Sequence, residues 1–316
     1  MKKIRAGVIG VGYLGQFHAE KYAGLPNVEL SGIVEKDQAR GEQIARKLNT
    51  AVFTDPSQLL GKVDAVSIVV PTILHYDIAK QFLDDGVHVL LEKPMTVTLE
   101  QADELIALAT RKKVVLQVGH IERFNPAITA ITPLLKSPGY LQAERSAPFT
   151  VRCTDVNVVL DLMIHDLDIV TNIAGSTPLK VSAMGSSIIT REIDAVIARI
   201  VFANGCVSDV TASRISDEKK RLLRIFDGDT LYTADYQTQK AFVSRRGQGD
   251  VPEFVTTEIV TDRRDTLLEE IRSFVDCIER KSRPTVSGTE GRNALALARL
   301  ITHSIENSIT EFVPFT

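Results

Sequence analysis

The chain of 316 residues contains no tryptophan and three cysteines, Cys153, Cys206 and Cys277. Because the cysteines are odd in number, far apart and without a CxxC pair, they predict neither a disulfide framework nor a zinc knuckle. They favour free thiols in a reducing compartment. No apolar run approaches the roughly 20 residues of a membrane span, and the first residues show no cleavage-site pattern. These absences predict a cytoplasmic protein without a membrane segment.

A large net charge is also absent, since 37 Lys and Arg residues oppose 40 Asp and Glu residues, for a formal net charge of -3. No global field therefore attracts nucleic acid or an anionic membrane surface, and a bound anion has to be held by local geometry. Hydrophobic residues make up 44% of the chain and charged residues 24%. This composition is typical of a globular protein, and the length favours two domains.

The first part of the chain alternates between two kinds of pattern. From residue 4 to about 118, short apolar runs are separated by amphipathic helical patterns such as 73–86 and 98–112. Such alternation predicts βαβ units and a parallel sheet. The runs at 63–70 and 88–91 are almost wholly apolar, as expected of strands covered on both faces. We therefore predict an α/β fold that begins with a Rossmann domain, a doubly wound parallel sheet, over residues 1–122.

The pattern changes after about residue 125. Short β-rich segments joined by turns such as Asn204-Gly205 predict a large, mainly antiparallel open sheet. Helical periodicity returns in three segments, 163–174, 264–281 and 290–308. We therefore predict an α+β domain over residues 123–316, for substrate binding and oligomerisation.

A glycine-rich turn, GVGYLG at 10–15, follows the first apolar run and precedes a helical pattern. In this context glycines allow a pyrophosphate to approach the backbone at a helix N-terminus, although a tight turn without a ligand is an alternative. Glu35 ends the second predicted strand, where an acid can bind the adenosine ribose and repel a ribose phosphate. It could instead cap a helix, and Lys36 could weaken the preference. NAD is expected rather than NADP, with contacts from Gly10, Gly12, Tyr13 and Leu14.

The decapeptide DLMIHDLDIV, residues 161–170, places three aspartates and a histidine in an apolar segment. In a helix, Asp161 and His165 lie four positions apart on one face, where the carboxylate can orient the imidazole. A catalytic pair, capping acids and a metal site are the three possible interpretations. No HExxH motif or Cys/His cluster accompanies the segment, so we expect no metal. Asp166 and Asp168 are expected to be early-helix acids or structural hydrogen-bond acceptors.

Four motifs occur in order: GVGYLG at 10–15, VPTILH at 70–75, EKP at 92–94 and DLMIHDLD at 161–168, with a fifth, weaker match at 288–300. In this combination the chain resembles the Gfo/Idh/MocA oxidoreductase family over essentially its whole length. The resemblance implies a Rossmann domain followed by a domain whose open sheet covers the nicotinamide and often forms the oligomer interface. A homodimer or homotetramer through the C-terminal sheet is expected.

The resemblance also implies that Lys93, Asp161 and His165 carry the chemistry. A neutral histidine, with an ordinary pKa near ~6.5, suits a general base for a hydroxyl proton, and an aspartate can fix its tautomer or bind a substrate hydroxyl. Lys93 would stabilise the developing alkoxide, although an ion pair with Glu92 is an alternative. His75 and His120 follow predicted strand ends, where packing or capping is an equally open interpretation. The remaining predicted cofactor contacts are Pro71, Thr72, His75, Glu92, Lys93 and Gln117.

Two positions depart from the family pattern: Met163 replaces a common glycine and Thr72 a common asparagine. A finer resemblance comes from QVGHIERFNPA at 117–127, which is similar to the branch of UDP-N-acetylglucosamine 3-dehydrogenases. This branch oxidises the sugar 3-hydroxyl to a ketone. Arginines would bind the diphosphate, Arg145 among the candidates, unless they pair with nearby acids. The predicted substrate contacts are His120, Arg123, Asn125, Arg152, Asp155, Asp161 and His165.

The sequence thus predicts an NAD-dependent dehydrogenase of a nucleotide sugar. A dehydrogenase of inositol or another free sugar is the alternative among enzymes, because it would need no arginine-lined diphosphate pocket. A non-catalytic NAD-binding sensor is the alternative from another class, since fold does not fix function. A sensor would be expected to have lost its lysine or histidine, and this chain retains both Lys93 and His165.

Overall fold

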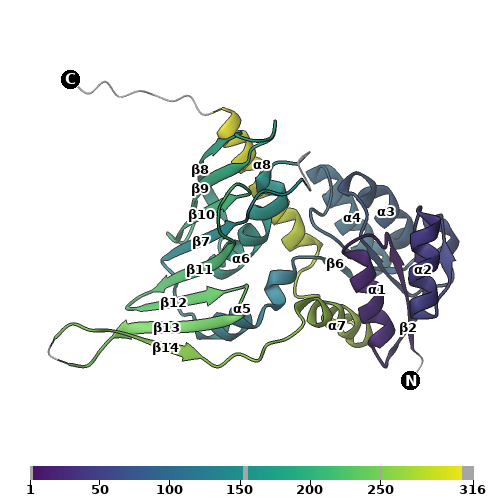
Figure 1. Cartoon of the computed structure of the whole chain (residues 1–316), viewed down its shortest axis with the longest axis horizontal. Coiled ribbons are helices and arrows are strands. Elements are labelled where there is room, and N and C mark those ends of the chain that lie inside the picture. The colour runs from purple at the N-terminus through teal and green to yellow at the C-terminus, as the bar shows by residue number, and fades with distance from the viewer. Residues whose placement is uncertain (1–2, 152–155, 250, 308–316) are drawn as a thin grey trace. The chain divides into compact units, whose positions relative to one another are not determined.

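The computed structural model describes residues 3–151, 156–249 and 251–307 (Figure 1). Within these ranges, no helix is both long enough and apolar enough to cross a membrane. The described cysteines, Cys206 and Cys277, are buried and free.

The chain divides into two compact units, each formed by two separate segments. The first unit comprises Met1–Phe124 and Arg264–Asn293, and the second comprises Asn125–Arg263 and Ala294–Thr316. The chain first passes from one unit to the other between Phe124 and Asn125, close to the predicted boundary at residue 122. The prediction that all of 123–316 forms the second domain is wrong, because the chain returns to the first unit at Arg264.

The first unit contains a parallel sheet with the strand order β3-β2-β1-β4-β5-β6. The order reverses direction next to β1, which creates the switch point where a doubly wound sheet binds its ligand. The fold class predicted from the alternating pattern is therefore confirmed. The strands are β1 (Ile4–Ile9), β2 (Val28–Val34), β3 (Val52–Phe53), β4 (Ala65–Ile68), β5 (His88–Leu91) and β6 (Leu116–Val118).

Helices cover both faces of this sheet. One apolar cluster joins α3 and α4 to the strands, and another joins α1, α2 and α7 to them. Asp55 and Thr98 each begin a helical segment with a capping box, in which the side chain of the first residue and that of the glutamine three positions on each accept a backbone N–H. The helices are α1 (Gly15–Gly24), α2 (Gln38–Leu48), α3 (His75–Asp84), α4 (Leu99–Lys112) and α7 (Thr266–Arg280), with short 3-10 turns η1 (Pro56–Leu59), η2 (Thr72–Leu74) and η3 (Ile121–Phe124).

Helix α7 belongs to the first unit because its apolar face packs there. Leu267, Ile271 and Phe274 recur at helical spacing and are buried in the same cluster as residues of α1. Figure 1 shows α7 next to α1. Lys21 of α1 is 2.5 Å from the carboxylate of Asp265, which caps α7. Periodicity predicts that this helix exists, but which sheet it covers depends on tertiary packing.

The second unit contains an eight-stranded sheet with the order β14-β13-β12-β11-β7-β10-β9-β8. Its pairings are antiparallel except for the parallel pair of β7 and β10. We did not predict β14, because its side chains are mostly exposed and lack apolar alternation. The strands are β7 (Tyr140–Ser146), β8 (Pro178–Ser186), β9 (Ala195–Phe202), β10 (Val207–Ser213), β11 (Lys220–Asp227), β12 (Thr230–Asp235), β13 (Lys240–Arg246) and β14 (Phe254–Ile259).

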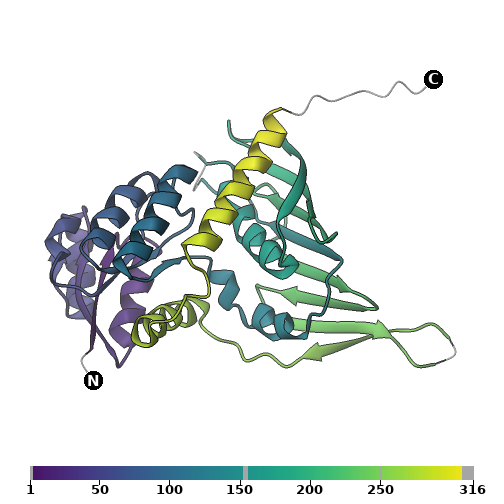
Figure 2. The ribbon, with the colours of Figure 1, turned by 180° about the vertical axis from the view of Figure 1, so that it is seen from behind.

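One face of this sheet carries the core of the second unit. In β9, Val196, Ala198 and Ile200 are buried in one cluster with residues of α6 and the later part of α8, two helices that are visible against the sheet in Figure 2. Residues at alternate positions, such as Ile197, face away from this core and are exposed. The helical segments are α5 (Pro126–Ile131), η4 (Thr132–Leu134), η5 (Val159–Met163), α6 (Ile164–Ala174) and α8 (Gly288–Glu306).

Candidate active site

The glycine-rich turn has the steric requirements of a phosphate-binding turn. Gly10 has φ 84°, and a Cβ there would lie 2.6 Å from the carbonyl oxygen of Val69. A Cβ at Gly15 would lie 1.8 Å from the carbonyl oxygen of Gly10, so both positions exclude side chains. A Cβ at Gly12 would meet nothing within 4 Å. The backbone at Gly12 is therefore open for the approach of a pyrophosphate, which fits a bound dinucleotide.

Glu35 connects the second strand to this turn. One carboxylate oxygen accepts the backbone N–H of Val11 at 3.2 Å. The other accepts the N–H of Asp37 at 3.1 Å and a guanidinium N–H of Arg40 at 3.0 Å. The charged group beside Glu35 is thus Arg40, a contact that sequence spacing did not reveal. The ribose contact of Glu35 stays a prediction.

His75 is the last residue of the motif VPTILH, and its ring contacts backbone carbonyls of this motif and of the motif EKP. Its ring nitrogens lie 2.8 Å from the carbonyl oxygen of Val70 and 3.0 Å from that of Pro94, and the residue is buried. Burial lowers its pKa, although both carbonyls act in the opposite direction, so the neutral ring donates to one of them. The structure therefore gives His75 a structural role, holding two strand-end loops together, in place of the predicted cofactor contact.

Glu92 and Lys93 follow β5 at the carboxyl edge of the sheet, and the peptide bond between Lys93 and Pro94 is cis. One oxygen of Glu92 accepts the backbone N–H of Lys93 at 3.2 Å. The other lies 3.3 Å from Nε2 of His18, a buried residue of α1. A Cβ at Gly119 would approach this carboxylate to 2.8 Å. The position of the Glu92 carboxylate is therefore fixed by the backbone of Lys93, the ring of His18 and the close approach of Gly119.

His120 is buried, and the positive charge of Lys93 acts on its imidazole ring. Burial, the charge of Lys93 and the charge of Arg123 together lower its pKa to about 3. The imidazole is therefore neutral near pH 7. It can contribute a hydrogen bond to a substrate but no positive charge. Arg123 donates to the carbonyl oxygen of Thr285 at 3.3 Å.

Gln117, predicted as a cofactor contact, lies in the interior of the first unit. It has no exposed surface, and its amide donates to the backbone carbonyl of Glu270 at 3.2 Å. A side chain in this position supports α7 and does not face a ligand. The prediction failed because position on a strand near its carboxyl end does not give the direction of the side chain.

In the second unit, the decapeptide begins inside a π-helical turn, Val159–Met163, and continues as α6. Such wide turns occur frequently at functional sites. Asp161 and His165 are both partly exposed. Met163 is fully buried among the apolar residues of the second unit. Met163 therefore acts in the packing of the second unit.

Asp166 and Arg145 form a buried ion pair. The guanidinium donates two hydrogen bonds to the carboxylate, at 2.6 Å and 3.1 Å, and both side chains are at most 3% exposed. The Arg145 guanidinium also lies 5.6 Å from the ring centre of Tyr236. Asp166 is thus a structural acceptor, and Asp168 is also buried. The suggestion that Arg145 binds the diphosphate is wrong, because its cation is already neutralised inside the unit.

Asn125 caps helix α5. Its carbonyl oxygen accepts the N–H of Ala127 at 3.1 Å, and its amide donates to the carbonyl of Tyr236 at 3.0 Å. Both ends of this buried amide thus serve the fold, which favours a structural role over the predicted sugar contact. Arg152 and Asp155 lie outside the described residues. In the part of the chain that the structure describes, no group of three side chains could hold a metal ion.

The buried polar residues that the sequence analysis did not single out include His18, Tyr22, Ser67 and Glu270. The spacing of His18 and Tyr22 places them on one face of α1 with other buried residues. Glu270 follows Leu267 by three positions and precedes Phe274 by four, which places it on the apolar face of α7. An acid within an apolar stripe was therefore the one sequence signal that could have found it.

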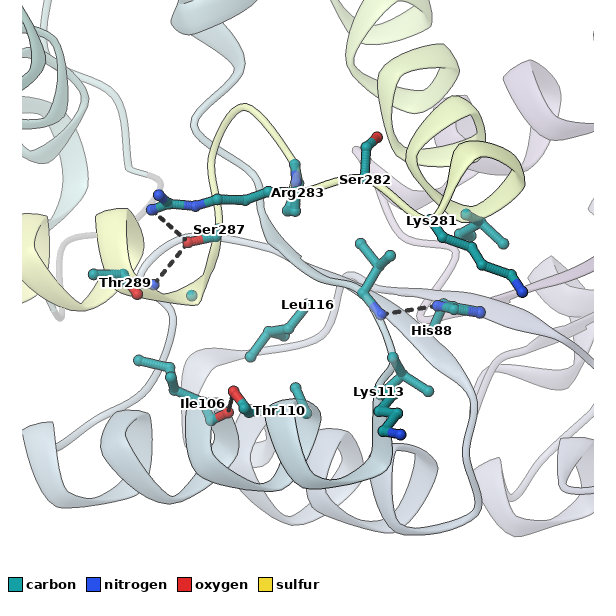
Figure 3. Close-up of a pocket in the computed structure, with 16 residues that line it drawn as sticks. His88, Ile106, Thr110, Lys113, Leu116, Lys281, Ser282, Arg283, Ser287 and Thr289 are labelled. Atoms are coloured by element: carbon teal, nitrogen blue, oxygen red, sulfur yellow. Dashed lines mark hydrogen bonds between the residues drawn. The ribbon is translucent and has the colours of Figure 1, made fainter.

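A cavity of about 750 Å³ lies at the opposite edge of the same sheet (Figure 3). His88 and Leu116 in its lining are the first residues of β5 and β6. Lys113 and Lys281, which end α4 and α7, also line it. Because the cavity is at the amino ends of the strands, it is distinct from the expected dinucleotide site.

A doubly wound sheet with an open glycine-rich turn, and with a lysine at the carboxyl end of its fifth strand, defines a dinucleotide-dependent oxidoreductase. The family model "Oxidoreductase family, NAD-binding Rossmann fold" matches residues 4–120, and the model of the Gfo/Idh/MocA C-terminal domain matches residues 141–230. The chain belongs to the Gfo/Idh/MocA family, and its cofactor is NAD.

Relatives cover nearly the whole chain. UDP-N-acetylglucosamine 3-dehydrogenase of Acidithiobacillus ferrooxidans is 39% identical over 97% of this chain and 98% of its own length. A solved structure of that enzyme matches with a TM-score of 0.92 at 37% identity, covering 97% of this chain and 98% of that chain. The scyllo-inositol 2-dehydrogenase (NAD(+)) of Bacillus subtilis is 25% identical over 97% of this chain and 95% of its own length.

Proposed function

We propose that this oxidoreductase converts the 3-hydroxyl of UDP-N-acetylglucosamine to a ketone. The observation that carries this proposal is the 39% identity to the Acidithiobacillus ferrooxidans dehydrogenase of that substrate, against 25% identity to the Bacillus subtilis inositol enzyme. Both relatives are covered nearly end to end, so the difference does not arise from a shared domain alone. The segment QVGHIERFNPA at 117–127, on which we based the finer resemblance, supports the same choice.

Oxidation of a secondary alcohol requires removal of a proton and of a hydride, and NAD supplies the hydride acceptor. His165 takes the hydroxyl proton, because a neutral imidazole has a pKa suited to this transfer near pH 7. Asp161 fixes the tautomer of His165 and stabilises the imidazolium that forms. Lys93 stabilises the negative charge that develops on the substrate oxygen.

The UDP diphosphate needs hydrogen-bond donors or cations. Arg123 remains a candidate, because the residue is partly exposed and its guanidinium carries a positive charge that a diphosphate can pair with. Arg152 and Asp155 remain predicted substrate contacts.

The substrate proposal is tested by NADH formation with UDP-N-acetylglucosamine, N-acetylglucosamine, scyllo-inositol and myo-inositol at equal concentrations. We expect the nucleotide sugar to give a kcat/KM at least about 100-fold higher than any free sugar, because losing the diphosphate contacts removes a few kcal/mol of binding. Arg123→Met should reduce this ratio through KM. Turnover of the free sugars alone would show that the substrate is an inositol or another free sugar.

The exposed face of the second sheet supports assembly into a homodimer or homotetramer, which we propose as the second part of the function. Met184 and Ile197 are paired in register on β8 and β9, and they are 76% and 60% exposed. The rings of Tyr140 and Phe226, on paired strands of the same sheet, contact each other with their centres 5.2 Å apart. Apolar side chains on an open sheet face are typical of an interface between subunits.

Light scattering after size-exclusion chromatography checks the assembly. Ile197→Glu, combined with Met184→Glu, should lower the molar mass towards that of one 34.7 kDa chain. Val260→Glu is the control, because Val260 is 89% exposed but lies outside the paired strands. An unchanged mass for the double variant would show that assembly does not use this face.

A further inference from the structure

Glu270 lies in the interior of the first unit without a partner for its carboxyl group. It has no exposed surface, and neither carboxyl oxygen makes a hydrogen bond within the described residues. An unpaired buried carboxylate is costly, so burial raises its pKa well above the ordinary value, and the charge of Glu92 raises it further. Burial without a partner therefore favours the neutral, protonated form of the Glu270 carboxyl group.

A row of buried polar groups leads from α1 to Glu92. The hydroxyl of Tyr22 lies 2.9 Å from that of Ser67, which lies 3.2 Å from Nδ1 of His18. Nε2 of His18 lies 3.3 Å from a carboxylate oxygen of Glu92. Glu92 has a 12% exposed side chain, whereas His18 is fully buried. Glu92 is thus the member of this row that connects the interior to the surface.

The strand order places these groups under one half of the dinucleotide site. Glu35 directly follows β2, on the side of β1 where the adenosine ribose is expected. The nicotinamide half is therefore expected over β4 and β5, and Glu92 follows β5 directly. The oxidised nicotinamide ring carries a positive charge that the reduced ring lacks. A positive charge near a buried acid favours the ionised form of that acid.

We propose that Glu270 and Glu92 form a buried proton store that compensates for the charge of the cofactor. Glu270 gives up one proton to the solvent when NAD⁺ binds, and the carboxylate that remains balances the cationic ring. Reduction by hydride transfer removes the ring's charge, and Glu270 then takes one proton back. The store moves protons only, and it goes beyond the proposed function because it depends on the cofactor and not on the sugar.

Other ionisable groups could contribute to such a proton balance, so the test has to separate them from Glu270. Helices α1 and η3 pack against α7. Their titratable and charged side chains are His18, Glu20, Lys21, Tyr22, Glu122 and Arg123.

Calorimetric titration in buffers of different ionisation enthalpy measures the protons released on binding. At pH 7.5 we expect NAD⁺ to release up to about one proton more than NADH does, with an affinity for NAD⁺ that rises by up to about tenfold per pH unit. Glu270→Gln preserves the shape of the neutral acid and should abolish both effects. Glu269→Gln is the matched control, since Glu269 precedes Glu270 on α7 but pairs with Arg272 at the surface.

A Glu270→Gln variant that still releases the extra proton would overturn the proposal. If this variant does not fold, infrared difference spectra of the unaltered protein serve instead. The carbonyl band of a protonated carboxyl should lose intensity on binding of NAD⁺ and not of NADH, and an unchanged band would contradict the store. Proton release on cofactor binding does not involve the sugar. If the enzyme did not oxidise UDP-N-acetylglucosamine, the proposed function would be refuted, but this inference would still hold.

Discussion

Lys93→Met lowers kcat by about two to three orders of magnitude, because one charged donor to a developing alkoxide contributes about that factor. The methionine keeps much of the length of the lysine side chain and removes its charge. The affinity for NAD should change by less than about threefold, since the turn at Gly10, Gly12 and Gly15 holds the cofactor phosphates through the backbone.

Steady-state kinetics with NAD titrations on the same preparations check this result. Lys80→Met is the control, because Lys80 pairs with Glu104 on the surface of α3 and α4. The control should keep kcat within about twofold. An unchanged kcat for Lys93→Met would remove Lys93 from the chemistry, and a loss of NAD binding would make it a cofactor contact.

Asp166→Asn should lower the stability of the protein, whereas Asp161→Asn should lower kcat, although the two residues are five positions apart in one segment. Asp166→Asn leaves Arg145 buried without its counter-ion, so we expect the free energy of unfolding to fall by about 3–5 kcal/mol. Asp161→Asn leaves this ion pair intact. It should lower kcat by about 100-fold or more, since the amide no longer stabilises the imidazolium of His165.

Urea denaturation followed by circular dichroism measures the first effect, and kcat of the folded fraction measures the second. A stable Asp166→Asn protein would contradict the assigned structural role of the ion pair. An Asp161→Asn protein with full kcat would leave His165 without its proposed partner. Arg145→Met combined with Asp166→Leu should recover stability, because it removes both charges together.

The fold was largely predictable because its strands and helices carry regular apolar patterns. The exceptions show what such patterns omit. β14 has mostly exposed side chains, so no alternation marks it. Helix α7 was predicted as a helix but assigned to the wrong unit, since Leu267, Ile271 and Phe274 indicate a buried face without indicating its partner.

The site was predictable where motifs determine it and uncertain where side-chain direction matters. Gly10, Gly15 and Glu92 have surroundings that explain their motifs. His75 and Gln117 lie at the predicted strand ends, but their side chains bond to the backbone inside the unit. The direction of these side chains depends on packing between distant segments, which spacing along one strand does not encode.

Polar residues in the interior were the least predictable part. Arg145 and Asn125 are residue types expected to bind a diphosphate and a sugar. In the structure, Arg145 pairs with Asp166 and Asn125 bonds to the backbone of Tyr236. Glu270 was overlooked because a single acid in an amphipathic helix is usually exposed. Its burial becomes evident only when α1, β5 and α7 are assembled.

The central claim is hydride transfer from C3 of UDP-N-acetylglucosamine to NAD, and isotopic labelling tests it most directly. With substrate that carries deuterium at C3 alone, the account predicts one deuterium at C4 of the nicotinamide in every NADH formed, together with a 3-keto product. Substrate deuterated at C4 or C6 should give unlabelled NADH. NADH that carries no deuterium from C3, or that acquires it from C4 or C6, would contradict the account.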